Sequence, residues 1–179
     1  MATLPASDFA APLVSLEEYL HTSYHPDCDY VDGRIEERNV GEKEHSILQR
    51  YLTFLFMLKR AEWGVEVFPE LRTQTHPETF RVPDVLVVRA GQSIDRYLTE
   101  PPLIAIEILS PEDRLSRFQE RIDDYLDFGV EHIWILDPAS RRAWTADRTG
   151  LHLTQTGELT VSETPIRLVL GELFAELDR

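Results

Sequence analysis

The pattern of apolar and polar positions in the middle of the chain predicts two buried strands. Residues 85–88 form a continuous apolar run directly after Asp84, which is typical of a strand buried on both faces. Across residues 103–109 the side chains alternate strictly between two faces, so Glu107 shares its face with apolar neighbours while the isoleucines occupy the other. Each predicted strand therefore carries one carboxylate in apolar surroundings.

These two carboxylates suggest a metal site. Burying an ionised carboxylate costs roughly several kcal/mol unless a positive charge compensates it. Paired strands lie about 4.8 Å apart, so Asp84 and Glu107 together could hold one hard divalent cation. Each acid also has an alternative role. Asp84 could be a strand-start aspartate held by backbone amides, and Glu107 could form a buried ion pair with an arginine such as Arg121.

Helical periodicity predicts four helices along the chain. A short helix over residues 16–22 follows Ser15 and Glu18, which have the spacing of a capping box. Longer amphipathic helices are expected over residues 42–61 and 113–128, and a terminal helix over residues 171–177.

Turn residues and apolar runs predict the remaining strands. Residues 28–37 have the pattern of a β-hairpin closed by Asp32 and Gly33, which favour a type I′ turn. Further strands are expected at 65–68, 71–75 and 131–137, with a hairpin near Gly150 within residues 141–161. Together these elements predict an α/β fold with a mixed central sheet flanked by helices.

Length and composition are consistent with one globular domain. The 179 residues suit a single domain over residues 15–179, preceded by an N-terminal arm over residues 1–14. The single cysteine, Cys28, excludes a disulfide within the chain and fits a reducing compartment. No apolar stretch approaches the roughly 20 residues of a membrane span, and the N-terminus lacks the features of a signal peptide. We therefore expect a cytoplasmic protein that does not enter a membrane.

The net charge is unfavourable for binding a polyanion. The chain has 18 basic and 32 acidic residues, so 18 − 32 gives −14. A charge of this sign repels nucleic acid at long range, although a local basic patch could still bind phosphate.

Three arginines on the helix predicted at 113–128 are candidates for such a patch. Arg114, Arg117 and Arg121 follow i, i+3 and i+7 spacing, so they share one stripe of the helix and could face the metal site together. The alternative is a solvated helix edge. His45, at the start of the preceding long helix, could donate to a phosphate or to the metal-site network, or be a structural hydrogen-bond donor.

The ordered motifs of the chain resemble those of the Uma2 family of restriction-endonuclease-like proteins, a branch of the PD-(D/E)xK nuclease superfamily. The resemblance rests on Pro83-Asp84, then residues 107–111 (Glu-Ile-Leu-Ser-Pro), then Tyr125, and finally residues 129–138 ending in Asp-Pro. It runs from about residue 15 to residue 144 and includes the segment 29–33 and His45.

The resemblance implies roles for particular residues. Asp84 and Glu107 would hold Mg²⁺ or Mn²⁺, with the backbone carbonyl of Ile108 as a further ligand. The basic residue that the superfamily places two positions after the glutamate is absent, because Leu109 stands there, and its counterpart is Arg121. A guanidinium can bind a phosphate but cannot accept a proton.

Asp29 aligns with a glutamate that is common in the family. It would reach the metal through water; the alternative is an acid on a hairpin strand that faces solvent.

The resemblance therefore implies a metal-dependent endonuclease that hydrolyses DNA phosphodiester bonds. One alternative is a catalytically degenerate nuclease fold that acts as a binding or assembly module, which Arg121 and the net charge favour. Another is hydrolysis of a smaller phosphoester. We also expect a homodimer, for which the apolar residues within 141–170 could provide the contact surface.

Overall fold

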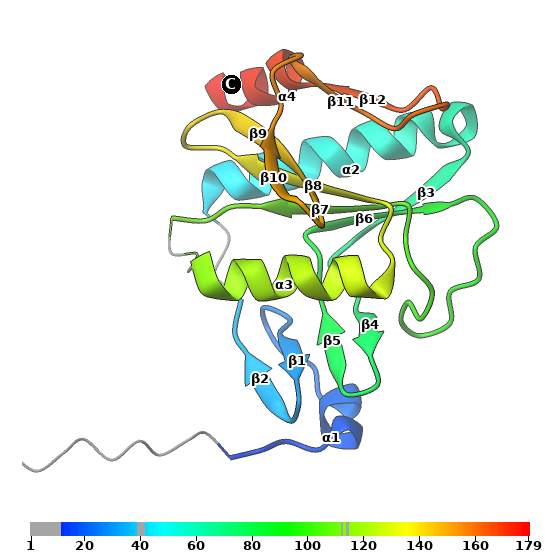
Figure 1. Ribbon diagram of the computed structural model, residues 1–179, viewed down its shortest axis with the longest axis vertical. Helices are drawn as coiled ribbons and strands as arrows, with labels where there is room; N and C mark the ends of the chain where they lie inside the picture. The colour runs from blue at the N-terminus through cyan, green and yellow to red at the C-terminus, as the bar shows by residue number, and fades with distance from the viewer. Residues whose placement is uncertain (1–11, 39–41, 112, 114) are drawn as a thin grey trace, which may run out of the picture.

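A six-stranded mixed sheet forms the centre of the computed structural model, which describes residues 12–38, 42–111, 113 and 115–179 (Figure 1). Only the parallel pairing of β7 with β8 interrupts an otherwise antiparallel arrangement. In spatial order the strands are β10 (Gly150–Leu153), β9 (Arg142–Asp147), β8 (His132–Asp137), β7 (Ile104–Ile108), β6 (Val85–Arg89) and β3 (Val65–Pro69). Most of the predicted N-terminal arm lies outside the described residues.

Helices cover both faces of this sheet. Figure 1 shows α2 (Lys43–Trp63) above the sheet and α3 (Leu115–Phe128) below it. The C-terminal helix α4 (Leu170–Ala175) and a 3₁₀ turn (Glu176–Asp178) lie beside α2. None of the helices in the described ranges is long and apolar enough to cross a membrane.

A second, four-stranded antiparallel sheet lies beneath α3 in Figure 1. Its spatial order is β2 (Arg34–Glu36), β1 (Asp29–Val31), β5 (Thr79–Arg81) and β4 (Thr73–His76). Helix α1 (Leu16–His21) packs on it through an aromatic cluster around Tyr19, Tyr30 and Phe80. Helix α3 therefore lies between the two sheets.

The side chains of β7 alternate between the two faces of the sheet, as the sequence predicts for this strand. The isoleucines of β7 belong to the apolar cluster that contains the buried face of α2, whereas Ala105 belongs to the cluster formed with α3. Glu107 points to the α3 side together with Ala105, because side chains two apart in a strand share a face. The position of the glutamate relative to α3 follows from this pattern.

Local signals in the sequence agree with the structure. The Ser15 hydroxyl accepts a hydrogen bond from the backbone N–H of Glu18 and caps α1. Asp32 and Gly33 both adopt positive φ, 45° and 83°, as a type I′ turn requires. The predicted fold class, a mixed sheet flanked by helices, is confirmed.

The strand predicted at 71–75 and the hairpin predicted near Gly150 are present, but their bounds differ because pairing partners in the tertiary structure set where a strand begins and ends. The strand expected at 71–75 is β4, which spans 73–76 and belongs to the second sheet. The hairpin expected within 141–161 ends at Leu153, and residues 158–160 form β11, which pairs with β12 (Arg167–Val169).

The apolar side chains expected to form a pairing surface within residues 141–170 are largely used inside the molecule. Six of them lie in the apolar cluster beneath α2: Ala143, Leu159, Val161, Ile166, Leu168 and Leu170. Leu151 and Leu153 are exposed, on the edge strand β10.

One buried arginine connects the second sheet to α3. The Arg81 side chain is 2% exposed and lies 3.0 Å from Asp29, 2.9 Å from Glu36 and 2.7 Å from Asp124. These partners come from β1, β2 and α3, so one guanidinium neutralises carboxylates from three elements. A buried arginine with this many charged partners stabilises their relative positions.

We expect Arg81→Met to lower the free energy of unfolding by about 3–5 kcal/mol, because it leaves the buried Asp29 carboxylate without its main counter-charge. Urea denaturation followed by circular dichroism measures this change. Arg89→Met is the control, because Arg89 and its partner Glu131 are both exposed and the pair should contribute less than about 1 kcal/mol. Equal losses in the two variants would contradict the proposed role of Arg81.

Candidate metal centre

Asp84 and Glu107 lie next to each other, as the sequence predicts. Strands β6 and β7 are antiparallel with Val85 opposite Ile106, so continuing the register by one residue places Asp84 opposite Glu107. Both residues are 2% exposed. The two carboxylates are therefore buried together at the end of β6 where the chain arrives from β5.

Asp84 has partners from three different parts of the chain. Its Oδ2 accepts a 2.7 Å hydrogen bond from the backbone N–H of Ile108 and lies 3.1 Å from His45 Nε2. Its Oδ1 accepts a hydrogen bond from Arg38. Burial raises the pKa of Asp84, but His45 and Arg38 outweigh that effect and hold this pKa below its usual value. The alternative role for Asp84, an aspartate held by a backbone amide, is therefore present at Ile108, together with the two side-chain partners.

Glu107 has partners on α3. Its Oε1 accepts a 2.6 Å hydrogen bond from the Tyr125 hydroxyl, and its Oε2 accepts one of 3.0 Å from Arg121. Burial raises the pKa of Glu107 to about 7, although Arg121 acts in the opposite direction. The buried ion pair with Arg121, weighed as an alternative from the sequence, is present in the structure.

Asp29 belongs to the same cluster of charges. It is fully buried, accepts a 2.9 Å hydrogen bond from the backbone N–H of Val82, and lies 3.4 Å from the Arg121 side chain. The alternative of a solvent-facing acid is therefore wrong. Arg121 lies between Asp29 and Glu107 and connects them.

The predicted arginine stripe on α3 does not converge on the site. Arg121 is 16% exposed and faces the carboxylates, whereas Arg117 is exposed. Arg114 lies outside the described residues. For Arg117 the solvated-edge alternative holds, and Arg121 is the described member of the stripe that contacts the acids.

Three other residues contribute to the site without having been assigned a role from the sequence: Arg38, Arg81 and Tyr125. Tyr125 stood within the family motif, and its helical spacing with the apolar residues of α3 indicated burial but not its bond to Glu107. Arg81 lies two residues before Pro83, and a charge at the start of an apolar run could have indicated a buried ion pair. Arg38 follows two glutamates in a polar stretch, where no pattern distinguishes it.

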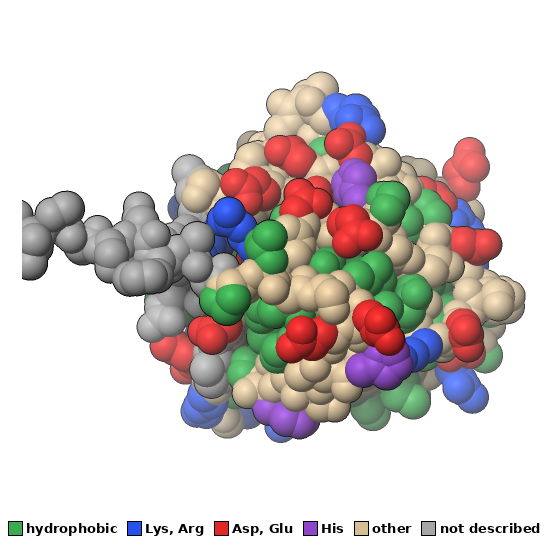
Figure 2. Space-filling view, turned by 90° about the horizontal axis from the view of Figure 1, so that it is seen from below, with side chains coloured by type: hydrophobic (Ala, Val, Ile, Leu, Met, Phe, Trp, Pro, Cys, Tyr) green, Lys and Arg blue, Asp and Glu red, His purple; other side chains and the backbone are tan. Residues whose placement is uncertain are grey.

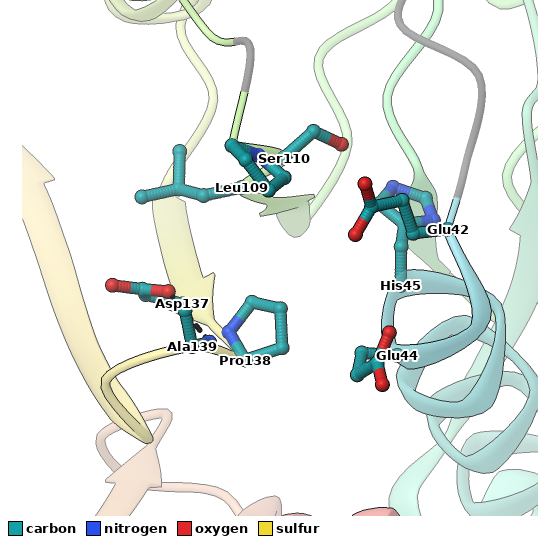
Figure 3. A pocket seen from close by; sticks show the side chains of 9 residues that line it. Glu42, Glu44, His45, Leu109, Ser110, Asp137, Pro138 and Ala139 are labelled. Carbon is teal, nitrogen blue, oxygen red and sulfur yellow. Dashed lines mark hydrogen bonds between the residues drawn. The ribbon is translucent and has the colours of Figure 1, made fainter.

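A cavity of about 530 Å³ lies beside His45, and neither Asp84 nor Glu107 is among its lining residues. Figure 3 shows its two sides: the start of α2, with Glu42, Glu44 and His45, and the ends of β7 and β8, with Leu109, Ser110 and Asp137. His45 lines the cavity and also contacts Asp84, so it connects this space to the buried acids. The charged residues in the lining, apart from His45, are acidic.

The oxygen donors suit a hard divalent cation. Mg²⁺ is commonly bound by one or two carboxylates and keeps several waters, which matches two neighbouring acids with a main-chain carbonyl at Ile108. Within the described ranges, no group of three or more His, Cys, Asp or Glu side chains is arranged to hold a metal ion. A cation here would therefore depend on Asp84 and Glu107, and both already contact an arginine.

The raised pKa of Glu107 predicts a pH dependence of stability. Its value is about 7 in the folded protein and about 4.5 in the unfolded chain. Between these values the folded state holds a proton that the unfolded state has lost, so the free energy of unfolding should fall as the pH rises from 4.5 to 7. We expect this fall to be smaller in Glu107→Gln by at least about 1 kcal/mol, measured by urea denaturation in EDTA.

Glu131→Gln is a matched control for this measurement. Its ion pair with Arg89 lowers the pKa of Glu131, so its contribution to stability is present above pH 4.5 and is lost as the pH falls. The two variants should therefore differ from the wild type with opposite signs. Parallel pH profiles for the wild type and Glu107→Gln would contradict the raised pKa.

Comparison with known proteins supports the motif analysis. A family model described as "Uma2: Putative restriction endonuclease" matches residues 16–174. A crystal structure from Anabaena variabilis, described as a putative nuclease belonging to DUF820, is similar with a TM-score of 0.78 and 21% identity. The alignment covers 92% of this chain and 99% of that chain. No curated protein is significantly similar in sequence.

The family match covers every strand of both sheets together with α2 and α3. It also includes the charged residues of the site: Asp29, Arg38, Arg81, Asp84, Glu107 and Arg121. At 21% identity the crystal structure supports the fold alone, and it does so over almost the whole chain. The motifs, the family model and the fold agree: the chain belongs to the Uma2 family of restriction-endonuclease-like nucleases.

Proposed function

We propose that this protein is a metal-dependent endonuclease that hydrolyses DNA phosphodiester bonds. The observation that carries the proposal is the placement of Asp84, directly before β6, beside Glu107 on the paired strand β7, with both residues buried. Replacing buried charged groups by apolar ones is often neutral or stabilising, so a pair of buried acids that serves no chemistry is easily lost. Membership of the Uma2 family supports the same reaction class.

Asp84 and Glu107 would hold the cation, with the main-chain carbonyl of Ile108 as a further donor. When bound, Mg²⁺ or Mn²⁺ would supply Lewis-acid stabilisation of a phosphoryl oxygen and an activated water. The chain's own residues position these acids: Tyr125 and the Ile108 N–H donate to them and fix their orientation. Arg121 is suited to donate to a phosphate oxygen, and it cannot be the general base.

His45 would act as a donor at the mouth of this site. Burial lowers the pKa of His45, but the hydrogen bond with Asp84 and the negative charge of that carboxylate together outweigh burial and raise the pKa above its usual value. A protonated imidazole can donate to a phosphate oxygen from the cavity that it lines. This supports the role that was considered from the sequence.

The negative surface charge of the protein is unfavourable for binding DNA. Acidic side chains are scattered over the face shown in Figure 2, and the basic side chains visible there lie mainly towards its margins. That face lacks the continuous basic surface by which proteins bind the DNA backbone. A protein of net charge −14 should therefore bind DNA weakly unless divalent cations are present.

We expect cleavage of plasmid DNA or short duplexes that requires Mn²⁺ or Mg²⁺ and stops in EDTA. Asp84→Asn and Glu107→Gln should each lower the rate at least about 100-fold, because each removes a cation ligand whose contribution is several kcal/mol. Asp127→Asn, at an exposed aspartate on α3, should cut at the wild-type rate. Bis(4-nitrophenyl) phosphate, assayed in parallel, separates a DNA nuclease from an enzyme for small phosphoesters.

The second candidate is a nuclease fold that no longer cuts and serves as a binding or assembly module. The arginines that already contact both carboxylates favour it, as does the negative net charge. It predicts a folded protein that neither cuts DNA nor binds Mn²⁺ by calorimetry. Mn²⁺ binding that Asp84→Asn abolishes would exclude this candidate.

We also propose that the protein forms a homodimer. The exposed Leu151 and Leu153 on the unpaired edge of β10 are the part of residues 141–170 that remains available for such a contact. Leu151→Lys combined with Leu153→Lys should shift the sedimentation coefficient from dimer to monomer in analytical ultracentrifugation. A wild-type monomer at all concentrations would contradict the proposal.

A further inference from the structure

Arg38 has an unusual position among the arginines of the site. It lies in the connection between β2 and α2, outside any helix or strand, yet its side chain is only 9% exposed. Its Nη2 contacts Asp84 Oδ1, and its Nη1 lies 3.6 Å from Glu70 Oε1. One guanidinium therefore bridges a buried carboxylate and a second one, Glu70, whose side chain is 45% exposed.

The oxygen that Arg38 contacts is one that a cation would need. The other oxygen of Asp84 already accepts the Ile108 N–H and lies against His45, which leaves Oδ1 with Arg38 as its described side-chain partner. A guanidinium and a divalent cation are both attracted to the same negative charge. Because Arg38 and Arg121 already neutralise Asp84 and Glu107, a divalent cation would bring two positive charges beside two arginines.

Of the two arginines, Arg38 is better placed than Arg121 to move away from its carboxylate. Arg121 is in the middle of α3 and is also held by Asp29, at 3.4 Å. Arg38 is in an irregular segment and already lies near Glu70, so it can keep a negatively charged partner at the surface after it leaves Asp84. Gln49 donates to both Glu70 and the Asp84 main-chain carbonyl, which keeps these two residues close together.

From this arrangement we propose that Arg38 is an internal competitor of the divalent cation: it neutralises Asp84 in the cation-free protein, and the cation binds only when Arg38 moves to Glu70. The inference rests on the proposed function, because it concerns the same carboxylates. Only molecules in which Arg38 has left Asp84 can bind the cation, so the apparent affinity is the intrinsic affinity multiplied by the fraction of such molecules. The protein stays folded without metal and binds metal only at higher concentrations than the carboxylates alone would require.

Calorimetric titration of Mn²⁺ into Arg38→Met, Arg89→Met and the wild type tests the inference. Methionine keeps an unbranched apolar stem and has no charge, and its side chain is too short to reach where the guanidinium lies. Both variants lose one positive charge, but Arg89 pairs with Glu131 on the surface, away from the site. We expect Arg38→Met to bind Mn²⁺ about tenfold or more tightly than the wild type, and Arg89→Met to match the wild type.

Thermal unfolding gives a second readout that does not depend on catalysis. In EDTA, Arg38→Met should melt at a lower temperature than the wild type, because Asp84 loses a counter-charge. Mn²⁺ should raise the melting temperature of Arg38→Met more than that of the wild type. If Arg38→Met does not fold, Arg38→Lys keeps one charge without the planar guanidinium, and its Mn²⁺ affinity should still exceed that of the wild type.

The outcomes separate this inference from the proposed function. Equal Mn²⁺ affinities in the wild type and Arg38→Met, with binding lost in Asp84→Asn, would overturn the role of Arg38 and leave the metal site standing. Weaker binding in Arg38→Met would likewise overturn it. If the wild type and Arg38→Met are both folded and neither binds Mn²⁺, the metal site itself is wrong and the inference falls with it.

Discussion

Three carboxylates buried beside one another are unfavourable unless positive charges lie against them. At the junction of the two sheets, arginine side chains contact all three carboxylates. Asp29 comes from the second sheet, whereas Asp84 directly precedes β6 and Glu107 belongs to β7. Their counter-charges, Arg38, Arg81 and Arg121, come from a connection, from β5 and from α3. Separating these elements would leave charges unpaired in a region with little water, so their positions are mutually dependent.

The same ion pairs affect the chemistry of the site. A nuclease site that relied on its metal for charge balance would be unstable without it, because like charges would face one another. Here Arg38 and Arg121 lie against the two carboxylates and supply the balance. The consequence is competition, because any cation that reaches Asp84 and Glu107 meets carboxylates that are already neutralised. Stability in the absence of metal and affinity for metal are therefore opposed in this protein.

The negative charge around the site attracts divalent cations and repels DNA. The adjoining cavity has Glu42, Glu44 and Asp137 in its lining, and the whole chain carries a charge of −14. An acidic cleft concentrates divalent cations near its mouth and repels a polyanion. Cations bound near the mouth would reduce that repulsion. The approach of DNA and the loading of the site are thus coupled through the same ions.

The sequence by itself determined the elements whose signals are local. The Ser15 cap, the Asp32-Gly33 turn, the long helices and the alternation that turns Glu107 towards α3 depend on residues within a few positions of one another. The sequence also offered the pair of Glu107 with Arg121 as an alternative, but only the tertiary structure decided which arginines neutralise Asp84 and Asp29. Arg38 and Asp84 are 46 residues apart, and Arg81 and Asp29 are 52 apart, so no periodicity connects them. The burial of Asp29 likewise depends on the second sheet packing beneath α3, which β-strand patterns do not specify because they define faces and not partners.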